Sequence, residues 1–203
     1  MKKKYIYILA FLIIAILGYN SVYFKKLSDI KKTQKESFDF KAFADSIYHK
    51  GILKSKKTIA LTNLIASIKT NQEAAFTKHG NRLGIGNSAY FMIKSTGKII
   101  DIKDGIYTVA DEKNGVVFID TKYIFGNDLR DASGLVKLTD FKTNAQFNKV
   151  SENLNEIVRN EIPKQTKNVK IGDSISFSGA IKLNKKQTLF TDLLIIPSQI
   201  KLQ

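Results

Sequence analysis

The sequence predicts an α+β fold that follows a membrane-spanning helix, and three observations support this prediction. A continuous apolar segment directly follows the basic start of the 203-residue chain. Apolar residues then recur every three or four positions through residues 38–80, which is the spacing of a buried helix face. From residue 88 onward, short apolar runs are separated by glycine-containing pairs, a pattern typical of strands joined by tight turns.

Residues 5–24 are predicted to form the transmembrane helix and to contact membrane lipid. At about 1.5 Å per residue, twenty residues match a hydrocarbon core about 30 Å thick. Three lysines precede the segment, which is the layout of an export signal, so we expect the N-terminus in the cytoplasm. Further lysines follow it, and the positive-inside rule alone therefore leaves the orientation open.

This segment could be cleaved, lipid-modified or retained. A signal peptidase site needs small residues, and the best candidate pair, Ile16 and Gly18, fits poorly. Lipid attachment needs a cysteine, and the chain contains none. Retention as a signal-anchor is therefore predicted, with Tyr19 and Tyr23 as interfacial aromatics before a basic juxtamembrane linker, residues 25–37. The protein is expected in the cytoplasmic (inner) membrane as a single-pass protein, with its C-terminal part facing the periplasm or cell exterior.

Residues 38–203 are predicted to form a single extracytoplasmic domain, helical over 38–80 and barrel-forming over 81–203. The formal net charge is +15, with many lysines beside the membrane segment, where they suit anionic lipid headgroups. They are not interleaved with a nucleic-acid-binding motif, so no nucleic acid is expected. With no cysteine and two isolated histidines, neither a metal nor another cofactor is expected.

Three helices are predicted before residue 81. The first begins after Asp39 and ends at Gly51, the second covers residues 59–68, and the third runs from Asn71 to Gly80. Their apolar stripes indicate faces that pack on a core.

Strands are predicted next, over residues 90–94, 98–102, 106–110 and 116–119. The pairs that separate them, as turns, are Thr96-Gly97, Asp104-Gly105 and Asn114-Gly115. A polar loop is expected over residues 126–143, followed by a helix that starts near Phe147 and is terminated by Pro163. Apolar runs near residues 175–181 and 189–196 are predicted to complete the sheet.

The predicted elements follow the order of an OB-like β-barrel: a group of strands, one helix, and two last strands. In such a barrel the helix lies between the third and fourth strands. We therefore predict an OB-like barrel with one helix inserted before the last two strands, and a generic α+β sheet as the alternative. Barrels of this type bind oligonucleotides or oligosaccharides on one face, but the fold alone indicates neither function.

Four segments carry a resemblance to a known family: Arg82 to Phe91, Phe125 to Val136, Phe147-Asn148 with Asn155, and Gly172 to Gly179. Together they resemble a bacterial family of unknown function described as predicted periplasmic lipoproteins. The resemblance implies an envelope location and no established activity. Because genes of some members lie beside those of sugar-uptake ABC transporters, it also implies a sugar ABC transporter system as a partner. Where such lipoproteins carry the lipidated cysteine after a Leu-Gly pair, this chain has Tyr19.

Arginine is rare in this chain, and its positions suggest a ligand site. There are 30 lysines and three arginines, and an arginine presents a planar fork for carboxylate or phosphate that lysine lacks. Two arginines lie in loops rich in glycine and asparagine. The candidate ligand-binding residues are Arg82, Asn87, Asn127, Asp128, Arg130 and Asp131.

Several interpretations of these candidates stay open. Arg82 and Arg130 could make buried structural pairs, or could grip an anionic or sugar ligand together at a rim. Asp128 and Asp131 could belong to a rigid loop or could be oxygen ligands of a cation, although they lack the alternating spacing of a calcium loop. We expect the segments 82–91 and 125–136 to lie close together.

Two functions remain for the domain. No nucleophile-base pair is present in the sequence, so no catalytic residue is proposed, and a non-catalytic binding or accessory module is favoured. The alternative is an enzyme acting on envelope carbohydrate, which needs two carboxylates about 5 to 10 Å apart. Asp101, Asp104, Asp128 and Asp131 could supply them. An Asp131 locked onto an arginine would argue against the enzyme.

Overall fold

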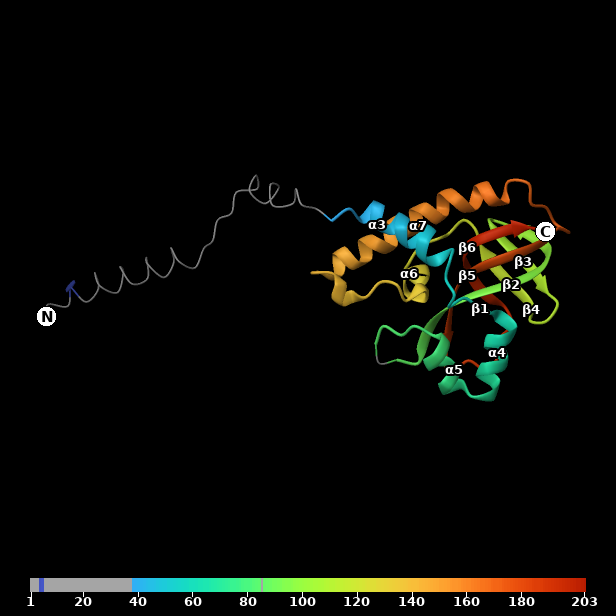
Figure 1. Ribbon diagram of the computed structural model, residues 1–203, viewed down its shortest axis with the longest axis horizontal. Coiled ribbons are helices and arrows are strands. Elements are labelled where there is room, and N and C mark those ends of the chain that lie inside the picture. Colours follow the sequence, from blue (N-terminus) through green and yellow to red (C-terminus); the bar gives the residue numbers. More distant parts are fainter. Residues whose placement is uncertain (1–3, 6–37, 85) are drawn as a thin grey trace. The chain divides into compact units, whose positions relative to one another are not determined.

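The computed structural model describes residues 4–5, 38–84 and 86–203, and within them Asp39–Gln203 forms one compact unit (Figure 1). The predicted transmembrane helix, apart from Tyr5, and the linker over 25–37 lie outside the described residues. In the part of the chain that is described, no helix has the length and apolar character needed to cross a bilayer.

Five strands close into a barrel, and a sixth short strand joins it. They are β1 (Ile59–Ala60), β2 (Ser88–Lys103), β3 (Ile106–Asp111), β4 (Gly115–Asp120), β5 (Ser174–Asn184) and β6 (Leu193–Leu202). Their order is β1-β2-β3-β4-β6-β5, and an additional antiparallel pairing of β2 with β5 closes the barrel. β4 and β6 are parallel, and the chain between β4 and β5 carries the longest of the described helices. The predicted OB-like order is thereby confirmed.

The helices are α3 (Phe40–Ser46), the π-helix η2 (Ile47–Ile52), α4 (Leu61–Thr70), α5 (Gln72–His79), α6 (Asp128–Ser133), the 3-10 helix η3 (Leu138–Asp140) and α7 (Asn144–Thr166). The predicted first and third helices are confirmed. Side chains cap both, because Asp39 accepts from the N–H groups of Lys41 and Ala42, and Asn71 accepts from that of Ala74. α3 packs on α7, and α7 packs on β6.

The predicted turn at Thr96-Gly97 is wrong, because β2 runs through it as one strand of 16 residues. β5 pairs with β2 without interruption from Ser88 to Lys98, and β3 pairs with it beyond that point. Gly97 instead permits a close approach of strands, since a Cβ there would lie 2.6 Å from the Ala110 carbonyl oxygen. The predicted turn at Asp104-Gly105 is confirmed, with φ values of 52° and 84°.

Two further regions also differ from prediction. The second helix starts at Leu61 rather than residue 59, because Ile59 and Ala60 pair with β2 as β1. Residues 126–143 are not all loop, since Leu129 and its neighbours in α6 are buried against β2 and β5.

Neither of the two prolines ends the helix or strand in which it lies. Pro163 lies inside α7, one turn before its end, where a missing N–H removes a single helical bond. Pro197 lies inside β6 beside the irregularity between Ser178 and Gly179, a position at which a strand tolerates proline.

The hydrophobic core fills the barrel and extends beneath α7. Phe91, Ile93 and Ile99 point inward from β2, and Leu154 with Val158 pack from α7. On the outer face of β2 and β5, α6 contacts one half of the strands, where Met92 and Ala180 are buried opposite each other. The other half of this face carries exposed polar side chains, and it forms the candidate site.

Candidate functional site

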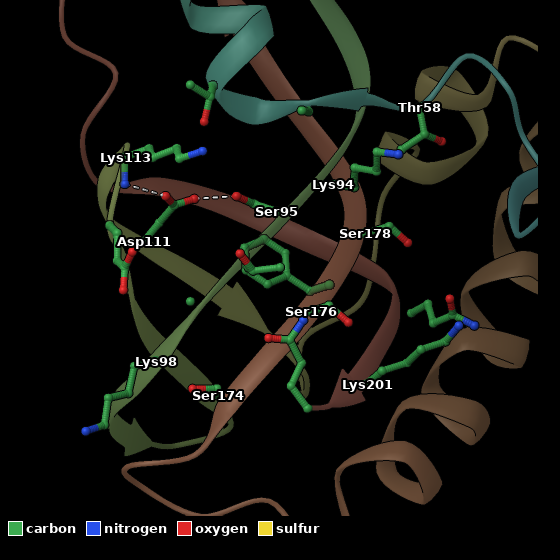
Figure 2. Close-up of a pocket in the computed structure, with 18 of the residues that line it drawn as sticks. Thr58, Lys94, Ser95, Lys98, Asp111, Lys113, Ser174, Ser176, Ser178 and Lys201 are labelled. Carbon is green, nitrogen blue, oxygen red and sulfur yellow. Dashed lines mark hydrogen bonds between the residues drawn. The ribbon is translucent and has the colours of Figure 1, made fainter.

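A groove of about 800 Å³ crosses the outer face of β2, β5 and β6. One wall comes from the segment that precedes and includes β1, and another from the turn between β3 and β4. Figure 2 shows the serines of β5 running between Lys98 on one side and Lys201 on the other.

The floor of this groove consists of nine polar side chains, three from β2, three from β5, two from β6 and that of Gln203, which directly follows β6. The pairing register sets three rows, which are Lys94, Ser178 and Gln199, then Thr96, Ser176 and Lys201, then Lys98, Ser174 and Gln203. Strand alternation explains why all nine share one face, because residues two apart point to the same side. The residues that lie between them on β5 and β6, such as Ile175, Phe177 and Ile200, are buried in the barrel.

The lining of the groove has more positive than negative charge. Its cationic residues are Lys56, Lys94, Lys98, Lys113 and Lys201, against Asp111 and Glu112. Asp111 is buried at the β3–β4 turn, where its carboxylate accepts bonds from the Ser95 hydroxyl, the Asn114 amide and two backbone N–H groups. Figure 2 shows the bonds from Ser95 and from the Lys113 N–H. Burial raises the pKa of Asp111, but these bonds outweigh it and hold the pKa below its ordinary value. Asp111 therefore stabilises the turn.

Aromatic side chains contribute almost nothing to the groove surface. Phe177 is the one aromatic among the described residues that line it, and it is 3% exposed. A ligand here would be held by hydrogen bonds and charge rather than by stacking.

Two of the predicted site residues, Arg130 and Asp131, are bonded to each other in the interior. The arginine Nε donates to Asp131 Oδ1 at 2.7 Å, and its Nη1 donates to the Phe147 carbonyl at 3.1 Å. Their exposed fractions are 2% and 3%, so neither presents its charge to a ligand. Burial raises the pKa of Asp131, and the arginine opposes this rise. Asp128, at the start of α6, also has a raised pKa because of burial.

Arg82 and Asn87 lie in the exposed loop that precedes β2. The Arg82 guanidinium donates to the Gly86 carbonyl and lies 4.0 Å from a Glu73 carboxylate oxygen. Arg82 is thus at the surface while Arg130 is buried, so the two guanidinium groups do not form one binding site for a ligand. The neighbouring Asn81 does connect the two motifs as expected, because its amide donates to the Ala132 carbonyl at 2.8 Å.

Asn127 lines a second, smaller pocket of about 380 Å³ between residues 125–127 and α7. Its other lining residues are Phe125, Gly126, Asn148, Ser151, Glu152, Asn155 and Arg159. Arg159 is not among the site residues predicted from the sequence. A signal was present, since the polar residues of α7 recur at intervals of three or four, beside its apolar stripe.

The groove was also missed from sequence, although its signal is visible. Polar residues alternate with apolar ones at 174–178, and Lys94, Thr96 and Lys98 recur at every second position of β2, although Ser95 between them is also polar. Within the described ranges, no group of three or more histidine, cysteine or acidic side chains is placed to hold a metal ion.

A closed five-strand barrel with an inserted helix and an exposed polar groove defines an OB-fold protein. Over residues 12–201 the chain matches the family described as predicted periplasmic lipoprotein (DUF2291), and it belongs to this family. The function of the family is unknown, and membership indicates an extracytoplasmic location.

The solved structures that match this chain include the following two. An OB-fold protein from Thermotoga maritima is 26% identical, with a TM-score of 0.70 over 83% of this chain and 100% of that one. An OBody bound to hen egg-white lysozyme is 14% identical, with a TM-score of 0.24 over 72% of this chain and 87% of that one. No curated protein matches the chain.

Proposed function

We propose that this protein is a non-catalytic binding module of the cell envelope that holds an extended anionic polymer in the groove over β2, β5 and β6. The observation that carries the proposal is the nine-residue floor, which consists of lysine, serine, threonine and glutamine side chains. Ammonium groups and hydroxyls donate hydrogen bonds to carboxylate, sulfate or phosphate oxygens, and bonds to charged groups are the stronger ones.

The spacing of the lysines favours a polymer over a single small anion. Lys94 and Lys98 lie four residues apart on β2, which corresponds to about 13 Å along a strand. Lys201 lies two strands away, at roughly 10 Å across the sheet. A chain with a charge on each unit can contact all three ammonium groups while the lysines extend away from the sheet, whereas a single small anion would have to draw the three side chains together.

The chemistry of the groove disfavours single-stranded nucleic acid. Proteins that bind such strands without sequence preference stack bases on exposed aromatic rings. The groove offers only the buried Phe177 among its described lining residues.

The alternative of a carbohydrate-active enzyme gains no support from the four candidate aspartates. Asp131 is bonded to Arg130, and Asp101 and Asp104 are exposed at the turn between β2 and β3. None of the four lines the groove. A pair of carboxylates facing a shared cleft is what the enzyme would require.

An association with a sugar-uptake transporter, which the family resemblance implies, is part of this proposal. It is tested by isolating the full-length protein from membranes in mild detergent and identifying the proteins that co-purify. Transporter subunits in the eluate support the association. An eluate without them, under conditions that preserve known transporter complexes, contradicts it.

The groove is tested by fluorescence polarisation with full-length protein in detergent and a labelled oligogalacturonate, an extended polymer with one carboxylate per unit. Maltohexaose is the neutral competitor. K94A/K201A should weaken binding at least tenfold, because two charge-assisted contacts are lost. K103A/K149A, which removes two exposed lysines outside the groove, should leave binding unchanged. Equal weakening by both variants, binding only to anionic lipid vesicles, or no binding would overturn the proposal.

A further inference from the structure

The geometry points to a second ligand site in the pocket between residues 125–127 and α7, and we propose that it binds a small hydroxylated carboxylic acid. This pocket shares no lining residue with the polymer groove. Its volume of about 380 Å³ suits a compact molecule rather than a polymer.

Two side chains of α7 hold the wall of this pocket in place. Asn155 donates to the Gly126 carbonyl at 2.9 Å, and Arg159, one turn further along α7, donates to the Ile124 carbonyl at 2.6 Å. These bonds fix the loop beside the helix, with Asn127 in the pocket lining. Phe125 is 62% exposed, and the Arg159 guanidinium lies 5.2 Å from the centre of its ring. The pocket is therefore built on a helix and a pinned loop.

A buried hydroxyl in the pocket lining has no hydrogen-bond partner in the described part of the chain. Ser151 is 3% exposed, and its Oγ makes no hydrogen bond among the described residues. A helical serine commonly bonds the carbonyl four residues earlier, which here is that of Phe147. That carbonyl accepts from Arg130 instead. A buried hydroxyl is costly unless it is bonded, and a ligand hydroxyl in the pocket would supply the bond.

The charged groups of the pocket indicate a carboxylate at one end of the ligand. One of the five N–H groups of Arg159 donates to the Ile124 carbonyl. No described carboxylate lies within 4.0 Å of the Arg159 guanidinium. Its planar fork is suited to a ligand carboxylate. Glu152 lines the same pocket two helical turns away, about 10 Å along α7, where it accepts from hydroxyls and repels a second carboxylate.

The test compares two sugars that differ in one carboxylate, D-galacturonate and D-galactose. Isothermal titration of the full-length protein in detergent should show saturable binding of galacturonate, with galactose at least tenfold weaker. R159K keeps the positive charge but loses the planar pair of N–H donors that can bond both oxygens of a carboxylate. It should therefore weaken galacturonate binding at least tenfold. S151A should weaken it about threefold without lowering the melting temperature. E152Q should bind equally or more tightly, and E156Q, an exposed change outside the pocket, should match wild type.

Several results would overturn this site. No saturable binding of either sugar would mean that the pocket holds only water. Unchanged affinity in both R159K and S151A would place the ligand elsewhere. Loss of galacturonate binding in K94A/K201A would assign the acid to the polymer groove. Failure of this site leaves the groove proposal standing, because the two use separate residues and probes.

Discussion

Arg130 and Asp131 are bonded to each other inside the domain, with the arginine Nε 2.7 Å from the aspartate Oδ1. The guanidinium also lies 3.5 Å from the centre of the Phe147 ring, so the pair connects α6 to α7. A planar cation can bond a carboxylate and stack on a ring together, which a lysine cannot do. This accounts for an arginine at this position in a lysine-rich chain.

Removing one member of this pair should strongly destabilise the domain. R130M leaves the Asp131 carboxylate buried without its cation, and the free energy of unfolding should fall by about 3 to 5 kcal/mol. Denaturant unfolding followed by circular dichroism measures this loss. R82M, which changes an exposed arginine, should cost about 0.5 kcal/mol or less. A loss below about 1 kcal/mol for R130M would contradict a structural role for the pair.

A methyl group at Gly179 should destabilise the barrel. A Cβ at this position would collide with the carbonyl oxygen of Ile196 on β6, where the β5–β6 register shifts. G179A should cost about 1 to 3 kcal/mol, as overpacking does. G84A is the matched control, because a Cβ there meets nothing within 4 Å. Equal melting temperatures for the two variants would show that β5 and β6 approach less closely than described.

The stability contributed by Asp128 should depend on pH. Burial raises its pKa in the folded chain above the ordinary value of 3.8, so the protonated form favours folding. That contribution is complete below pH 3.8 and is lost as the pH rises through the folded pKa. D128N carries no charge, so its stability relative to wild type should increase between pH 4 and pH 7. Unfolding midpoints across this range test the trend, with the exposed change E156Q as control, and a constant difference would contradict it.

The sequence predicted the elements better than the site. The helix caps at Asp39 and Asn71 and the turn at Asp104-Gly105 depend on local chemistry, so they were found. Thr96-Gly97 looks like a turn from sequence, and only the continuous pairing with β5 shows that it is strand. Predictions from local sequence do not take account of pairing with a strand that is far away in the chain, such as β5.

The site was harder to predict because it depends on which strands become neighbours. The alternating residues of 94–98 and 174–178 become one surface only when β2 and β5 pair. The sequence allows Arg130 either a buried structural pair or a ligand contact, and only the fold shows that Asp131 and Phe147 enclose it.

Residues 5–24 should anchor the protein without being cleaved, because the chain has neither a cysteine for lipid attachment nor a well-fitting signal peptidase site. The native protein should sediment with membranes, resist extraction by alkaline carbonate and retain its N-terminal sequence by mass spectrometry. A cysteine introduced at Lys142, an exposed position, should react with an impermeant thiol reagent in outer-permeabilised cells. Recovery of a shortened, water-soluble form would contradict the anchor, and labelling only after lysis would contradict the orientation.

Binding of an anionic polymer across β2, β5 and β6 is tested most directly by NMR chemical-shift mapping of the full-length protein titrated with tetragalacturonate. The account predicts saturable shifts concentrated at residues 94–98, 174–178 and 199–203, which vanish in K94A/K201A. Shifts confined to the 82–87 loop, or no shifts at saturating ligand, would contradict it.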